Sequence, residues 1–235
     1  FAVFASFYCK AQKTDSAVIR SIANEILTNS RAYENLRYLC KKIGPRLSGS
    51  ANAAKAVEAT FRMLREAGAD TVYLQPCMVP HWVRGAKETG YAVLPGNKRQ
   101  AINLCALGNT VGTGIKGVFA AVVEVKSMEE LHELGKQGVE GKIVLFNLPM
   151  NPTHVQTFRA YGESGIGRRI GAAQAAKYGA VAVMVRSLAS NIDPYPHTGA
   201  TQYNDSFPKI PAVAISTMDT EWMSASLKNG VPVKV

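Results

Sequence analysis

Histidine is scarce in this sequence, and the histidines that are present lie far apart. None of the four histidines begins a His-x-Asp or His-Glu-x-x-His pattern; they are His81, His132, His154 and His197. A functional zinc site needs three or four His, Cys, Asp or Glu ligands that converge on one point. We therefore expect no metal ligand and no catalytic residue within this stretch.

Cysteine is equally sparse. The four cysteines form no Cys-x-x-Cys pair; they are Cys9, Cys40, Cys77 and Cys105. Without Cys9, which belongs to an apolar N-terminal segment, an odd number remains, and this argues against a disulfide framework. The apolar neighbours of the other three predict buried thiols, and a cysteine-nucleophile enzyme is not expected.

Residues 1–8 are apolar and aromatic, but a membrane-spanning helix needs about 20 apolar residues. The segment looks like the end of a signal-peptide hydrophobic region, with cleavage near Ala11. A short helical or disordered N-terminus is the alternative. Tyr8 is too bulky for the small residue expected before a lipidated cysteine. We therefore expect residues 1–12 to be a signal-peptide remnant and the protein to be exported, either periplasmic or secreted, without stable membrane insertion.

Positive charge is abundant but not concentrated. The formal net charge is +10, which raises the question of nucleic acid as a partner. The closest basic pairs are isolated from one another: Lys41-Lys42, Lys98-Arg99 and Arg168-Arg169. A generally basic, solvated surface is the simpler interpretation, and no nucleic-acid partner is expected. A hydrophobic content of 47% with 19% charged residues is typical of a folded globular protein.

The first part of the chain is predicted to be mainly helical. Apolar residues recur at helical spacing over 14–27, 30–43 and 51–67, and Ser50 is a plausible N-cap for the third helix. The pattern over 71–83 is strand-like, and strands at 91–94 and 101–107 flank a likely turn at Pro95-Gly96-Asn97-Lys98. Residues 14–108 contain too few elements to cover their own apolar faces.

A glycine-rich stretch at 108–114 is the best candidate for a domain boundary. After it, strands and helices alternate, and a Ser127-to-Glu130 capping box opens one helix. Strands are predicted at 117–125, 142–148, 180–185, 210–215 and 231–235, and helices from 127, at 166–178 and at 220–228. Near-continuous apolar strands between helices indicate an α/β fold, with a sheet covered by helices.

Three motifs carry a family resemblance. They are Gly44-Pro45-Arg46-Leu47-Ser48-Gly49-Ser50, Val79-Pro80-His81-Trp82-Val83-Arg84-Gly85 and Pro196-His197-Thr198-Gly199. Together they resemble the carboxypeptidase Q (plasma glutamate carboxypeptidase) group of dinuclear zinc exopeptidases. Residues 141–230 also look like a protease-associated domain. The resemblance covers nearly all of residues 30–235.

The resemblance implies a division of labour along the chain. Residues 13–110 would be the N-terminal portion of a peptidase α/β domain, and residues 111–235 an inserted protease-associated domain. The ligands for two zinc ions and a general-base glutamate would lie beyond Val235. The parent protein would hydrolyse dipeptides or short peptides; whether it would act as an aminopeptidase or a carboxypeptidase is left open. The resemblance also implies that the parent protein is a homodimer. The alternatives are a non-catalytic protease-associated binding module and an interaction protein that ends at this point.

Three residues are predicted to contact substrate: His197, Thr198 and Arg46. His197 can donate a hydrogen bond, Thr198 can donate or accept one, and Arg46 can bind a carboxylate as a two-pronged fork. The alternative for His197 is a loop histidine that is bonded locally. The alternative for Arg46 is a structural pairing with a helix C-terminus or a buried aspartate.

Two further patterns are given simpler interpretations. The acidic and histidine side chains at 129, 130, 132 and 133 lack a second histidine at the required spacing, so they predict a solvated helix face. The pattern Gly165-x-Gly167-x-x-x-Gly171 has the wrong spacing for a phosphate loop and no strand running into it. It is interpreted as a flexible helix entry.

Overall fold

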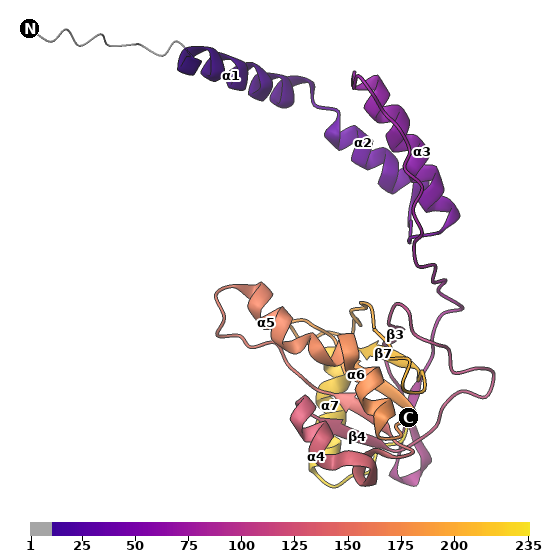
Figure 1. Ribbon diagram of the computed structural model, residues 1–235. Helices are drawn as coiled ribbons and strands as arrows, with labels where there is room; N and C mark the ends of the chain where they lie inside the picture. Colours follow the sequence, from indigo (N-terminus) through magenta and orange to yellow (C-terminus); the bar gives the residue numbers. More distant parts are fainter. Residues whose placement is uncertain (1–10) are drawn as a thin grey trace, which may run out of the picture. The chain divides into compact units, whose positions relative to one another are not determined.

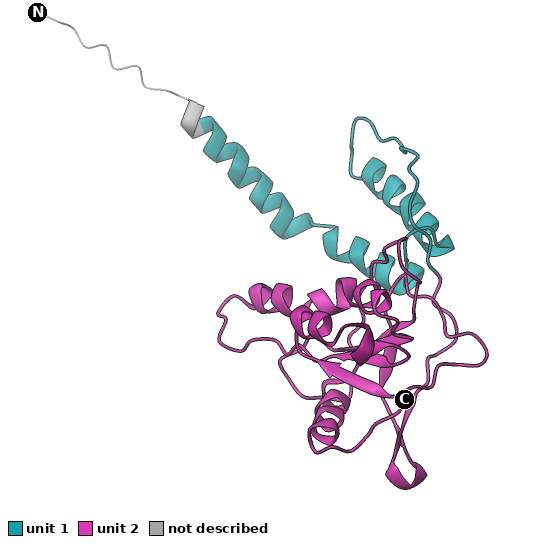
Figure 2. Cartoon of the chain, turned by 60° about the horizontal axis from the view of Figure 1, so that its bottom comes forward, with its two compact units in different colours: residues 1–82 teal, residues 83–235 magenta. Residues whose placement is uncertain are grey.

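The computed structural model describes residues 11–235 (Figure 1). The chain forms two compact units, residues 1–82 and residues 83–235 (Figure 2). The predicted signal-peptide remnant lies outside the described residues, except for its last two positions. Among the helices of the described part, none combines the length and the apolar character needed to cross a membrane.

The first unit is helical, as predicted. Its elements are α1 (Ala11–Asn29), α2 (Ala32–Tyr38), a π-helical turn (Leu39–Ile43) and α3 (Ala51–Glu66). Ser50 caps α3, because its side chain accepts a hydrogen bond from the Ala53 amide at 3.1 Å. This bond satisfies one of the N–H groups that the first turn of a helix leaves unpaired.

Two predictions for the first unit are wrong. Residues 71–83 form no strand, because an extended segment needs a neighbouring strand for its backbone hydrogen bonds and the described part of this unit is helical. Cys40 and Cys77 are exposed rather than buried. Both thiols lie in a unit where, over residues 14–82, Ala59 is the one residue classed as buried.

The apolar faces of the first unit are uncovered, as the small number of elements predicted. On α1, Ile19, Ile22 and Ile26 are 65%, 54% and 59% exposed. On α3, Val57 and Leu64 are about half exposed. Burying such side chains is normally worth about 1.5–3 kcal/mol each. Because these side chains are exposed to solvent, they do not contribute that free energy to the stability of the unit.

The second unit is built on a five-stranded mixed sheet with the order β3-β7-β6-β5-β4. Neighbouring strands β4 to β7 are parallel, and β3 is antiparallel to β7. The strands are β3 (Leu104–Ala106), β4 (Val122–Val125), β5 (Ile143–Phe146), β6 (Ala182–Arg186) and β7 (Ala212–Ile215). A separate hairpin pairs β1 (Tyr91–Leu94) with β2 (Lys98–Ala101) around the predicted turn. The apolar runs thus predicted β1 and β3 to β7, with ends that differ by a few residues, whereas β2 begins within the predicted turn and was not predicted.

Helices cover both faces of the sheet, which confirms the α/β class. They are α4 (Met128–Val139), α5 (Thr157–Ser164), α6 (Ile166–Lys177) and α7 (Thr217–Lys228). Alternate residues of β5 point to opposite faces. Val144 and Phe146 pack in one core cluster with residues of α4 and α6, and Ile143 and Leu145 pack in another with residues of α7.

Three details of this unit differ from the sequence patterns. Helix α5 was not predicted. Residues 231–235 form no strand, although Lys234 makes isolated bridges to Val93 and Ala121. Compact packing also begins at Val83 rather than after 108–114, since β3 pairs with β7. The assignment of 13–110 to a peptidase domain and 111–235 to a protease-associated domain stays a prediction.

The glycine pattern at 165–171 serves packing. Phe146 is fully buried, and α6 lies directly over its ring. A Cβ atom added at Gly171 would lie 2.7 Å from Phe146 Cε2, and one added at Gly167 would lie 3.0 Å from Phe146 Cβ. These two glycines therefore allow the helix to approach the sheet closely.

Replacing Gly171 with alanine is expected to lower the free energy of unfolding by about 1–3 kcal/mol, because the new methyl group overpacks the Phe146 ring. Urea unfolding followed by Trp222 fluorescence, in a background where Trp82 is phenylalanine, measures this effect. The matched control is Gly162→Ala in α5, where an added Cβ meets nothing within 4 Å. It should be neutral or stabilise by up to about 1 kcal/mol. Equal behaviour of the two variants would contradict the packing argument.

Candidate functional site

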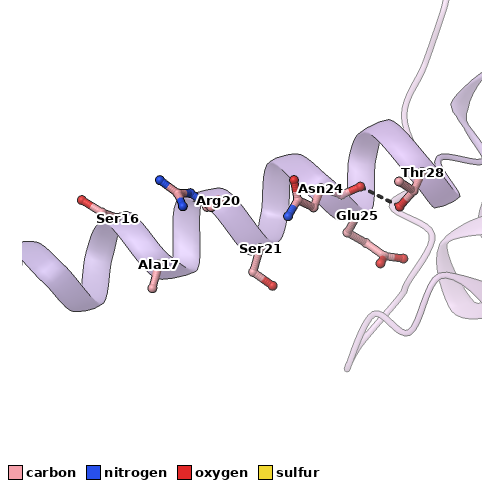
Figure 3. A pocket seen from close by; sticks show the side chains of 7 residues that line it. All are labelled: Ser16, Ala17, Arg20, Ser21, Asn24, Glu25 and Thr28. Atoms are coloured by element: carbon pink, nitrogen blue, oxygen red, sulfur yellow. Dashed lines mark hydrogen bonds between the residues drawn. The ribbon is translucent and has the colours of Figure 1, made fainter.

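In the hollow beside α1, no polar or catalytic side chains from different elements of the described chain come together at one point. It measures about 730 Å³ and is lined by α1 alone; Figure 3 shows its residues along one face of that helix. The lining residues are Ser16, Ala17, Arg20, Ser21, Asn24, Glu25 and Thr28. A binding site is normally concave, with walls from several elements. This hollow is a feature of an uncovered helix.

A second hollow, of about 660 Å³, lies between α3 and the segment formed by α2 and the π-helical turn. Tyr38 and Val57 provide apolar surface in its lining. The charged residues of the lining are Lys42, Lys55, Glu58 and Arg62. Neither a cysteine nor a histidine lines it. These side chains are more typical of a protein–protein contact surface than of a catalytic site.

The first two family motifs meet within the first unit. Ser48 Oγ donates to the Pro80 carbonyl at 2.7 Å. Gly49 has a φ of 74°, and a Cβ atom at that position would lie 3.1 Å from His81 Cβ. Gly49 is therefore required both for its backbone conformation and for the close approach of His81. The turn and the Pro80-His81 segment form one local structure.

Arg46 closes the end of the preceding helical segment. Its Nη1 donates to the Leu39 carbonyl at 3.2 Å and to the Gly44 carbonyl at 3.0 Å. This geometry is the helix C-terminal pairing that the sequence left open as the alternative. Contact of Arg46 with substrate stays a prediction.

In the second unit, the rest of the second motif is held against the edge strand β3. Arg84 Nη2 donates to the Ala106 carbonyl at 3.0 Å, and Arg84 Nη1 donates to Glu88 Oε1 at 2.5 Å. Glu88 Oε1 also accepts from the Ala106 amide at 3.0 Å. Burial would raise the pKa of Glu88, but its backbone hydrogen bonds and Arg84 outweigh this effect, so the pKa is lowered.

The third motif reaches the same carbonyl. Thr198 Oγ1 donates to the Ala106 carbonyl at 2.9 Å, so Arg84 and Thr198 share one acceptor. The backbone N–H of His197 donates to Ser187 Oγ at 2.8 Å, which fixes the loop to the end of β6. His197 and Thr198 are exposed. The structure thus joins the second and third motifs at β3.

Arg168 of α6 supports the third motif from the other side. Its Nη1 donates to the Thr198 carbonyl at 3.5 Å, and its Nη2 donates to the hydroxyl of Tyr161 on α5. The guanidinium carbon lies 4.9 Å from the centre of the Tyr161 ring, a cation–π distance. Sequence reasoning missed this cluster. The one signal was the isolated Arg168-Arg169 pair.

Described residues do not assemble a metal site. No group of three or more His, Cys, Asp or Glu side chains in this part of the chain could hold a metal ion. His132 lies against Tyr178, with ring centres 6.0 Å apart. His154 Nε2 lies 2.8 Å from Glu163 Oε2, and this hydrogen bond is the main reason that the pKa of Glu163 is lowered.

Buried polar groups gather where the parallel strands end. Arg186 is 5% exposed, and its Nη1 donates to Asn147 Oδ1 at 3.2 Å and to Glu221 Oε1 at 2.6 Å. Asn147 in turn donates to Glu124 Oε1 at 2.5 Å. The charge of Arg186 is therefore matched by the carboxylate of Glu221, and this network ties the ends of β4, β5 and β6 to α7.

Asp219 forms a second network at the start of α7. Its Oδ2 accepts from the Asn103 amide at 2.8 Å and from Ser216 Oγ at 2.6 Å, and its Oδ1 accepts from Trp222 Nε1 at 3.0 Å. Burial would raise the pKa of Asp219, but the bonds from Ser216, Trp222 and Asn103 lower it overall. The carboxylate thus links the residue that precedes β3, the N-cap of α7 and a tryptophan.

Comparison with known proteins identifies relatives. No protein-family model matches the chain. Carboxypeptidase Q from Xenopus laevis is 34% identical over 230 residues, which cover 95% of this chain and 46% of that protein. The crystal structure of a peptidase M28 precursor from Shewanella amazonensis matches with a TM-score of 0.83 at 30% identity, over 94% of this chain and 49% of that one.

A zinc aminopeptidase from Bacillus subtilis matches with a TM-score of 0.53 at 20% identity, over 87% of this chain and 42% of that one. Identity this low supports the fold alone. In each comparison, the chain spans less than half of the length of the protein that it matches.

Proposed function

This chain is homologous to carboxypeptidase Q over 95% of its own length, and we propose that it is part of an exported zinc-dependent exopeptidase. The proposed substrates are dipeptides or short peptides. The observation that carries the proposal is this homology, together with the 30% identity to an M28 peptidase of known structure. The contacts among the three motifs add support, since Ser48 bonds to Pro80 and Arg84 shares an acceptor with Thr198.

The proposed zinc ions belong to the whole enzyme. The described residues do not fit a zinc site, because no three metal-ligating side chains come together. We assign no catalytic step to them. The relatives are more than twice as long as the matched region, and the remaining part of such a protein is proposed to supply the metal ligands.

The role proposed for this stretch is to shape the substrate cleft. In this proposal, residues 111–235 are a protease-associated domain that walls the cleft, and residues 13–110 belong to the peptidase domain. The exposed loop with His197 and Thr198 would face the substrate. Ser187 and Arg168 bond to its backbone, and the Thr198 hydroxyl donates to the Ala106 carbonyl, so the loop is held in place before substrate arrives.

The 235-residue chain, purified alone with added zinc, is expected to hydrolyse no dipeptide. It is also expected to bind a hydrophobic dye strongly, because Ile19, Ile22 and Ile26 are exposed. A polypeptide extended by the coding sequence that follows Val235 should show zinc-dependent release of terminal residues. Robust zinc-dependent hydrolysis by the short chain would contradict the proposed division. An extended polypeptide that binds peptides without cleaving them would favour a non-catalytic binding module instead.

A further inference from the structure

We propose that Arg168, together with Tyr161 and the His197-Thr198-Gly199 loop, binds the free C-terminal carboxylate of a peptide. The proposal rests on the function proposed above only for the identity of the ligand as a peptide. It assigns the second unit a specific contact with substrate, made by a residue outside the three family motifs.

The charge of Arg168 is not neutralised within the described part of the chain. Its two hydrogen-bond acceptors are a phenol, on Tyr161, and a backbone carbonyl, on Thr198. No carboxylate of the described residues lies within 4.0 Å of it. An arginine fork matches the two oxygens of a carboxylate, and such charge-assisted bonds are the stronger class.

Two basic residues near the α5 side of the cluster are paired with a carboxylate, unlike Arg168. Arg159 Nε lies 3.3 Å from Glu163 Oε1, and His154 lies on the other oxygen of the same carboxylate. Glu163 thus binds two basic side chains on the α5 side of the cluster, and it forms no ion pair with Arg168. An incoming carboxylate would therefore find the guanidinium of Arg168, unlike that of Arg159, without a carboxylate partner in the described chain.

The guanidinium is also held in position. It stacks on the Tyr161 ring, and the loop passes so close that a Cβ atom at Gly199 would lie 2.5 Å from Arg168 Nε. An arginine that is already ordered loses little side-chain entropy when it binds a ligand. Gly199, the last residue of the third motif, is the residue that permits this contact.

An apolar surface adjoins the cluster. Phe158 packs edge-on against Tyr161, with ring centres 6.2 Å apart, and 88% of Phe158 is exposed. Val155, in the segment before α5, is 98% exposed. An exposed aromatic side chain next to the ring that carries the cation fits a peptide whose last residue is apolar. The expected ligand is therefore a short peptide with an apolar C-terminal residue and a free carboxylate.

The test is a titration of the 235-residue chain with N-acetyl-Ala-Leu, followed by the amide NMR signals of Thr198 and Gly199 and the Nε–H signal of Arg168. The peptide acid should shift these signals, and the same peptide with a C-terminal amide should not. Arg168→Met is expected to weaken binding roughly tenfold or more, the value of a hydrogen-bonded ion pair. The matched control, Arg159→Met, should bind as the unmodified chain does.

Several outcomes would overturn the site. They are equal shifts with the acid and the amide, unchanged binding by Arg168→Met with native signals elsewhere, and equal shifts with inorganic phosphate or acetate at the same concentration. Binding is read without hydrolysis, so the two proposals can fail separately. An extended polypeptide that cleaves peptides while Arg168→Met binds normally would remove the site and leave the function.

Discussion

Replacing Phe146 with alanine is expected to lower the free energy of unfolding of the second unit by about 3–5 kcal/mol. Phe146 ends β5 and is fully buried in the core cluster between the sheet and helices α4 and α6. Its ring fills the space left by Gly167 and Gly171, which have no side chains of their own. The variant therefore loses apolar burial and leaves a cavity that neither glycine can fill.

Urea unfolding monitored by Trp222 fluorescence measures this loss, as for Gly171→Ala. Phe158→Ala is the matched control, because it removes the same atoms from a side chain that is 88% exposed. That variant should change the stability by less than about 0.5 kcal/mol. A loss of similar size in both variants would show that burial at Phe146 is not the cause.

Replacing Asp219 with asparagine is expected to cost about 2–3 kcal/mol at neutral pH, since removing the charge of a buried, hydrogen-bonded carboxylate leaves its donors poorly paired. The Asp219 side chain accepts from the Asn103 amide, Ser216 Oγ and Trp222 Nε1. An asparagine offers one oxygen and an NH₂ group, so at least one donor would face another donor.

The pH dependence of this effect has a definite sign. The folded-state pKa of Asp219 is lowered, so the carboxylate contributes stability above its unfolded pKa of about 3.9. That contribution disappears as the pH falls through the lower folded-state pKa. The stability difference between the native chain and Asp219→Asn should therefore be full above about pH 5 and shrink below about pH 4.

Denaturant unfolding at pH values from 7 to 2.5 checks this prediction. Asp205→Asn is the control, because the side chain of Asp205 is 96% exposed and its partner is a surface lysine, Lys209. Its effect should stay within about 0.5 kcal/mol at every pH. A constant difference between Asp219→Asn and the native chain down to pH 2.5 would contradict the role of the ionised carboxylate.

Much of the fold could be predicted from local sequence signals. Apolar runs predicted β5, β6 and β7, and serine caps predicted the starts of helices at Ser50 and Ser127. These signals act over three or four residues, or over one strand. The prediction failed for 71–83, where an alternating pattern is present but no strand lies alongside it. Burial of Cys40 failed for the same kind of reason, because it depends on a neighbouring layer.

The candidate site was predictable only in part. The motif at 196–199 pointed to His197 and Thr198, but the contacts that hold them come from Ala106, Ser187 and Arg168. Those partners are between about 10 and 90 residues away in sequence, and no local pattern encodes such distances. The role of Arg46 at a helix C-terminus was foreseen as an alternative, because both of its acceptors lie within a few residues.

The edge strand β3 comes from sequence that precedes the glycine-rich stretch, yet it pairs with β7 on the far side of that stretch. It thereby covers backbone groups of β7 that would otherwise invite another molecule to add a strand, a common route to aggregation. The glycine-rich stretch therefore connects two segments of the chain that contribute to one sheet. A polypeptide that lacked the first stretch would expose the outer edge of β7, and another molecule could then add a strand to it.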